Sequence, residues 1–101
     1  MVEQLSAEEA ACRALSGARP SLDEILSLWP PDHRDRIVLW VKVGYAGDLV
    51  IGAHAREQRV AGAGRRVKRD LLRIRDDVPV VLEFHDRDTV ILPLRTFREP
   101  R

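Results

Sequence analysis

The N-terminal part of the chain combines helix start signals with short apolar stripes. Ser6 and Glu9 form a capping box, which predicts a helix that runs to about Leu15. The same signal at Ser21 predicts a second helix over Leu22–Trp29, ended by two prolines. The apolar residues of this second helix recur at i, i+3, i+4 and i+7, and they are Leu22, Ile25, Leu26 and Trp29. A helix this short is stable only when such a stripe packs against another element.

From Ile37 onward the pattern changes to β-branched and aromatic residues. Two mainly apolar segments, 37–45 and 49–51, flank the sequence Ala46-Gly47-Asp48. A polar break between two such segments predicts an antiparallel hairpin, in which Gly47 supplies the positive φ that a short loop needs.

A second hairpin is predicted closer to the C-terminus. Its strands are Pro79–His85 and Thr89–Leu94, and its polar turn is Asp86–Asp88. Pro93 has no backbone N–H, so the second strand is expected at a sheet edge or at a bulge. Both strands are apolar on both sides, which predicts that the pair is covered on both faces or takes part in an interface.

The segment between the two hairpins is predicted to be helical. Val67, Leu71 and Ile74 share one helical face, whereas the residues around them do not alternate as in a strand. Glycines at positions 62 and 64 disfavour one continuous helix, so we expect a short helix over Ala55–Ala61 and a longer one over Arg65–Arg75. Burial of the apolar face of the longer helix would expose the opposite face, which carries Arg66, Arg69 and Arg73.

Together these elements predict an α+β fold class, with two N-terminal helices followed by two antiparallel β-hairpins that flank a basic helix. The chain has 101 residues, of which 45% are hydrophobic, so its core is modest and a single domain over residues 1–101 is expected. Within that domain, residues 1–31 form a helical part and residues 32–101 an α+β part.

The order of short helix, glycine-containing turn, basic helix and hairpin over Ala55–Leu94 resembles a winged helix-turn-helix. In that family the second helix enters the major groove of DNA and the hairpin forms the wing. The resemblance therefore implies DNA recognition by the basic helix.

Positive charge is concentrated in the middle of the sequence. Eleven Lys or Arg residues and four Asp or Glu residues lie between His33 and Arg75, whereas both ends are acidic and the whole chain has a net charge of +1. The candidate nucleic-acid-binding residues are those of the predicted basic helix: Arg65, Arg66, Lys68, Arg69, Arg73 and Arg75. Because such a face can contact several phosphates at once, we expect a non-enzymatic nucleic-acid-binding or regulatory module.

A protein partner is the alternative. The same basic residues could meet an acidic surface of another protein, or of a second copy of this chain. Interfaces are enriched in Arg, Trp and Tyr, and the chain offers Trp29, Trp40 and Tyr45. In this interpretation the protein is an assembly module, either a small accessory subunit or a homo-oligomer.

The sequence contains no recognisable catalytic or metal-binding motif. Cys12 is the only cysteine, which excludes an intramolecular disulfide and a multi-cysteine zinc site. The three histidines lack the spacing of helix-borne metal ligands. We therefore expect no enzyme activity, no catalytic residue, no cofactor and no metal. Because no apolar run approaches the roughly 20 residues of a membrane helix, we also expect no membrane partner and a cytoplasmic location.

Overall fold

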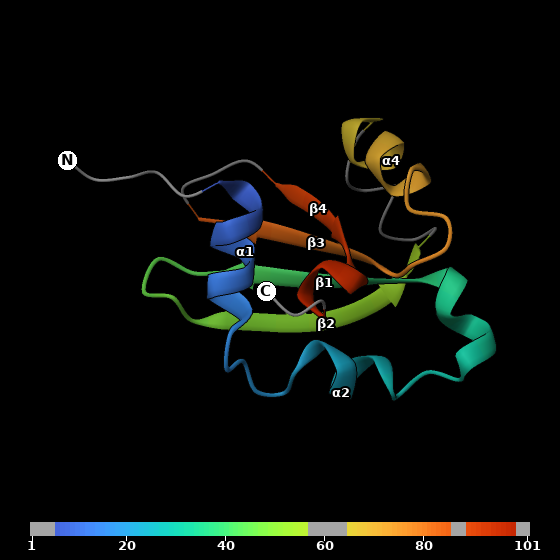
Figure 1. The fold of residues 1–101 in the computed structure, drawn as a ribbon, viewed down its shortest axis with the longest axis horizontal. Helices are drawn as coiled ribbons and strands as arrows, with labels where there is room; N and C mark the ends of the chain where they lie inside the picture. The colour runs from blue at the N-terminus through green and yellow to red at the C-terminus, as the bar shows by residue number, and fades with distance from the viewer. Residues whose placement is uncertain (1–5, 57–64, 86–88, 99–101) are drawn as a thin grey trace.

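The centre of the structure is a four-stranded sheet with the strand order β2-β1-β3-β4 (Figure 1). This computed structural model describes residues 6–56, 65–85 and 89–98. The strands are β1 (Ile37–Val43), β2 (Leu49–Ala55), β3 (Pro79–Phe84) and β4 (Val90–Pro93). β1 pairs antiparallel with β2, and β3 with β4, while β1 and β3 are parallel. The predicted α+β class is confirmed, but the predicted arrangement is not, because the parallel pair joins both hairpins into one mixed sheet.

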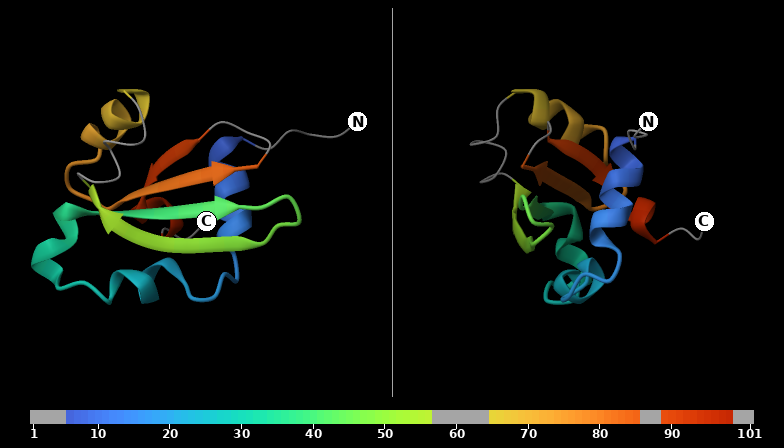
Figure 2. Two further views of the ribbon diagram at one scale, coloured as in Figure 1. Left: turned by 180° about the vertical axis from the view of Figure 1, so that it is seen from behind. Right: turned by 90° about the vertical axis from the view of Figure 1, so that its left-hand side faces the viewer.

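Helices lie on both faces of this sheet (Figure 2). In the described residues they are α1 (Ala7–Leu15), α2 (Leu22–Leu26), α4 (Arg65–Leu72) and the 3-10 helices η1 (Pro31–Arg36) and η2 (Leu94–Phe97). α1, α2 and η2 cover one face, and α4 covers the other. The sheet is therefore the middle of three layers.

The predicted start signals of the two N-terminal helices are present. Ser6 Oγ accepts a hydrogen bond from Glu9 N at 3.1 Å, and Ser21 Oγ accepts one from Glu24 N at 3.2 Å. Each serine thereby satisfies a backbone donor that has no partner within its own helix.

α2 is shorter than predicted and ends at Leu26 rather than Trp29. Leu28 N bonds to the Ile25 carbonyl and Trp29 N to that of Leu26, so the chain tightens into i→i−3 turns before the two prolines. The predicted apolar stripe is nevertheless confirmed, because Leu22, Ile25 and Leu26 are buried and Trp29 packs against the same core.

β1 is buried on both of its faces along Ile37–Val41. Successive side chains point to opposite faces of a sheet. The side chains that face α1 and α2 are Ile37, Leu39 and Val41, and those that face α4 are Val38 and Trp40. β3 divides in the same way, with Val80 and Leu82 on the first face and Val81 on the second. This arrangement explains why neither strand has the alternating pattern of a half-exposed strand.

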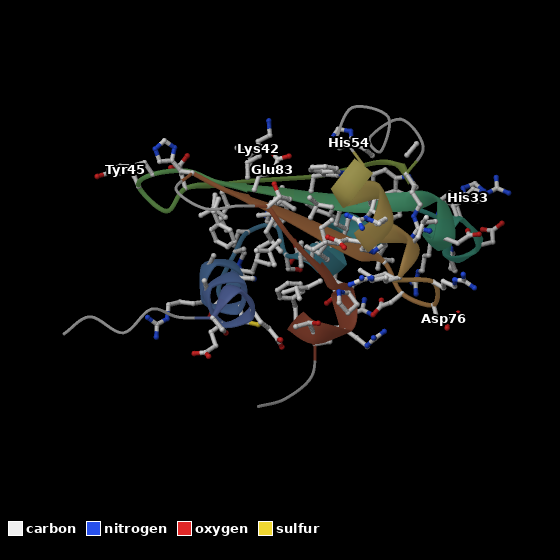
Figure 3. All side chains as sticks on the ribbon, turned by 90° about the horizontal axis from the view of Figure 1, so that it is seen from above. His33, Lys42, Tyr45, His54, Asp76 and Glu83 are labelled. Atoms are coloured by element: carbon white, nitrogen blue, oxygen red, sulfur yellow. The ribbon has the colours of Figure 1, made fainter. Side chains whose placement is uncertain are left out.

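α4 covers only one end of its sheet face. Its core cluster consists of Leu71, Val38, Trp40 and Val81, with Ile91 packed beside them. Further along the same face, the neighbouring strands β1 and β3 present Lys42 and Glu83, which Figure 3 shows rising on the side of α4. The change from apolar to polar residues marks where the covering layer ends.

The β1–β2 hairpin closes as the sequence predicts. Gly47 has φ +84°, and Gly47 N donates to Gly44 O at 3.1 Å while Gly44 N donates to Asp48 O at 2.8 Å. This is a three-residue hairpin loop in which a left-handed residue follows a turn. In the second hairpin, Pro93 ends β4 at the border of the sheet, as expected. The turn Asp86–Asp88 lies outside the described residues.

The predicted helix over Arg65–Arg75 is too long, because α4 ends at Leu72. Arg73 N bonds to Asp70 O at 3.2 Å and Ile74 N to Leu71 O at 3.1 Å, so the last turn tightens and the chain turns towards β3. Leu71 is buried as predicted and Ile74 is half-buried, whereas the Val67 side chain lies outside the described part.

Two other expectations are corrected. The short helix predicted over Ala55–Ala61 starts one residue later, because Ala55 is the last residue of β2 and Arg56 is helical, and residues 57–64 lie outside the described part. The winged-helix resemblance does not hold either. A wing is a projecting hairpin, whereas β3 lies inside the sheet between β1 and β4.

Replacing Leu71 with Ala should destabilise the protein by about 2–5 kcal/mol, because it removes an apolar anchor of α4 and leaves a cavity beside Val38 and Trp40. Leu72→Ala is the matched control, since Leu72 is 61% exposed while Leu71 is 2% exposed. The control should change the free energy of unfolding by less than about 0.5 kcal/mol. Urea denaturation measures both, and equal losses would contradict this packing of α4.

Candidate functional site

The structure describes the side chains of three of the six predicted basic residues. Arg65, Arg66 and Lys68 belong to α4, and their side chains lie outside the described part. Arg69 on α4 is exposed, and so are Arg73 and Arg75 in the loop that follows. Leu71, midway in sequence between Arg69 and Arg73, is buried against the sheet. The apolar side of α4 is therefore attached to the sheet while the described cations face solvent.

The α4–β3 loop lies at the end of the sheet where β1 begins and β2 ends (Figure 1). Arg56, directly after β2, donates from Nη2 to the Ile74 carbonyl at 3.3 Å and so connects β2 to this loop. At the same end, η1 leads into β1 and carries the exposed Arg34 and Arg36. Three segments that are distant in sequence thus bring arginines to one end of the sheet.

A cleft of about 490 Å³ opens at this end. Its charged lining residues are Arg34, Arg75, Arg98, Asp32, Asp35, Asp76 and Asp77. Of the predicted site residues, the described structure places Arg75 here. Arg34 and Arg98 were not among the predicted residues, because nothing in the local pattern brings η1 or η2 to the α4–β3 loop.

Two of these charged residues hold the fold together. Asp77 Oδ1 accepts from Val78 N at 2.7 Å, and Oδ2 accepts from Arg95 N at 2.9 Å. Its side chain is only 14% exposed and also lies 3.5 Å from Arg95 Nη1. Arg98 pairs with Asp23, which follows the first residue of α2. Asp77 and Arg98 therefore connect η2 to β3 and to α2.

The remaining charges of the cleft nearly balance. Arg34 and Arg75 have no ion-pair partner among the described residues, and three aspartates, Asp32, Asp35 and Asp76, line the same space. A polyanion would meet these carboxylates inside the cleft, so phosphate binding is disfavoured there. The exposed cations outside it, Arg69 and Arg73, are better placed for that role.

The described residues show no candidate metal centre. They contain no group of three His, Cys, Asp or Glu residues that could hold a metal ion. The histidines lie apart: His33 on η1 and His54 near the end of β2 are at separate places in Figure 3. His85 packs edge-on against Tyr45, with ring centroids 5.3 Å apart. Over the same described ranges, no helix has the length and apolar character needed to cross a membrane.

Comparison with known proteins gave no match. No family model matches the chain, and neither a curated protein nor a solved structure does. We therefore infer the function from the residues and geometry of the chain itself.

Asp77→Ala should lower the free energy of unfolding by about 1–3 kcal/mol, because the backbone donors of Val78 and Arg95 lose their acceptor. Asp76→Ala is the control at the neighbouring, exposed carboxylate and should stay within about 0.5 kcal/mol of the unchanged protein. Thermal or urea unfolding distinguishes the two. A larger loss for Asp76→Ala would contradict the role given to Asp77.

Proposed function

We propose that the protein is a non-enzymatic nucleic-acid-binding module that contacts phosphates through α4 and the loop after it. The proposed contact residues are Arg65, Arg66, Lys68, Arg69, Arg73 and Arg75. Arginine suits this role because its guanidinium is always charged and can donate two hydrogen bonds to one phosphate.

One observation carries this proposal. The buried Leu71 anchors α4, while Arg69 and Arg73 on either side of it in sequence are exposed. α4 also forms an outer layer on its face of the sheet, so a long, rod-shaped ligand can approach it (Figure 2). A nucleic-acid backbone is such a ligand, and its phosphates repeat along its length.

The charge of the neighbouring cleft limits how the ligand can lie. Asp32, Asp35 and Asp76 disfavour entry of phosphate into the cleft. We therefore place the backbone across the outer surface of α4, with Arg75 at the border of the contact. Contacts of this type provide affinity without sequence preference.

Replacing both Arg69 and Arg73 with Ala should weaken binding to a short duplex and reduce the salt dependence of the affinity. Each lost phosphate contact lowers the slope of log K against log salt concentration by about 0.9 for B-DNA, so a reduction of about 1.8 is expected. Fluorescence anisotropy titrations at several salt concentrations measure both quantities, and circular dichroism confirms that the variant is folded.

The matched control replaces Arg13 and Arg19 with Ala. It changes the net charge equally, but both residues are exposed in the N-terminal region, and α1 covers the opposite sheet face. Binding by the α4 surface predicts a small effect for this control. Equal losses for both variants would show that only net charge matters, and the absence of salt-dependent binding to DNA and RNA by the unchanged protein would refute the proposal.

A further inference from the structure

The two border strands of the sheet differ in how they are protected. β4 is short and ends in Pro93, which prevents further strand pairing at that end. β2, at the other border (Figure 1), has seven residues and contains neither proline nor Asp, Glu, Lys or Arg. Monomeric proteins usually block a border strand of this length with charge, proline or a bulge, or cover it with a helix or loop. The composition of β2 is instead that of a strand with a partner on both sides.

The hairpin determines which backbone groups of β2 point away from β1. Gly44 N bonds to Asp48 O, and the register continues with Val50 opposite Lys42 and Gly52 opposite Trp40. Bonded and non-bonded pairs alternate along an antiparallel ladder, so the even-numbered residues of β2 bond to β1. The residues that direct their N–H and C=O outward are therefore Leu49, Ile51, Ala53 and Ala55.

β2 is complementary to a second copy of itself. Antiparallel pairing about a two-fold axis at Gly52 sets Ile51 opposite Ala53 and Leu49 opposite Ala55. The outward N–H and C=O groups of one copy then meet those of the other along the whole strand. Val50 then lies opposite His54, and no pair brings two charged side chains together. A shift by one residue would set outward groups against inward ones and break the ladder.

Gly52 lies at the centre of this register. A Cβ at this position would be 4.0 Å from the nearest atom among the described residues, His54 Nε2, so packing among those residues does not require glycine. Glycine inside a strand is unfavourable and often marks the close approach of another backbone. In the proposed register Gly52 faces itself in a non-bonded pair, where the two Cα atoms are about 4.5 Å apart.

Exposed apolar side chains support a contact at this border. Val50 on β2 is 65% exposed. Leu28, two residues after α2, is 75% exposed, and α2 is the helix that packs against β2. Burying such side chains adds to the backbone hydrogen bonds of a strand pair.

We infer that two copies of the protein join through β2 to form a homodimer with one continuous sheet. The two-fold axis passes between the Gly52 residues, perpendicular to the sheet. The interface does not depend on nucleic-acid binding. If the proposed function holds, however, the symmetry places both α4 helices on the same face of the joined sheet, and one duplex can contact two basic helices.

Gly52→Cys tests the register directly. In a Cys12→Ser background, so that each chain has one cysteine, mild oxidation should cross-link most of the protein into dimers on a non-reducing gel. The distance expected at the axis lies within the range of disulfides. Val50→Cys in the same background is the control, because its position is paired with His54 of the second copy and not with itself. Absence of cross-linking at Gly52, or equal cross-linking at both positions, would overturn the inference.

The mass in solution provides a second test. The unchanged protein should have twice the 11.5 kDa mass of one chain in light scattering or sedimentation. Ala53→Pro removes an N–H that points away from β1, so the β1–β2 pairing keeps its hydrogen bonds while the proposed interface loses one, and the mass should halve. Ala53→Ser keeps this donor and should keep the dimer. If the unchanged protein remains monomeric at high micromolar concentration, self-pairing is refuted. A β2 strand that pairs with a different protein would give this same result. If Ala53→Pro fails to fold, the cross-linking result decides.

Discussion

The parallel pairing of β1 with β3 is the contact on which the rest of the fold depends. Each hairpin is a local structure, and this pairing joins the two, from Leu39 opposite Val80 to Val43 opposite Phe84. Because both strands are interior, their apolar side chains point to both faces, and each face needs a covering layer. The connection between parallel strands must also cross one face, and here that connection contains α4. The position of the basic helix is thus a consequence of the sheet topology.

Features that depend on a few neighbouring residues could be predicted from the sequence. Capping by Ser6 and Ser21, the positive φ of Gly47 and the border position of Pro93 each follow from the stereochemistry of one short segment. The burial of Leu71 follows from helical spacing in the same way. The parallel pair could not be predicted, because two strands that are apolar on both faces carry no signal for which strand lies beside which.

For the candidate site, too, local features could be predicted and long-range ones could not. The density of arginine in the sequence identified α4, but the end of the helix depends on how the chain turns towards β3. The cleft that joins Arg34 to Arg75 depends on the long-range pairing and could not be predicted. The role of Asp77 could not be predicted either, because Asp77 Oδ2 accepts a hydrogen bond from Arg95 N, and Arg95 follows the β3–β4 hairpin in the sequence. Charge alone does not distinguish such a structural carboxylate from the exposed Asp76 beside it.

The unequal size of the two core clusters has a consequence for dynamics. Among the described residues, the cluster beneath α1 and α2 is large and extends across all four strands, whereas the cluster beneath α4 is centred on Leu71, Val38, Trp40 and Val81. Native proteins open locally in cooperative units whose free energies reflect their buried contacts. α4 should therefore detach from the sheet more often than the strands separate from one another. An outer helix of this kind can adjust its position on a ligand while the sheet beneath it stays intact.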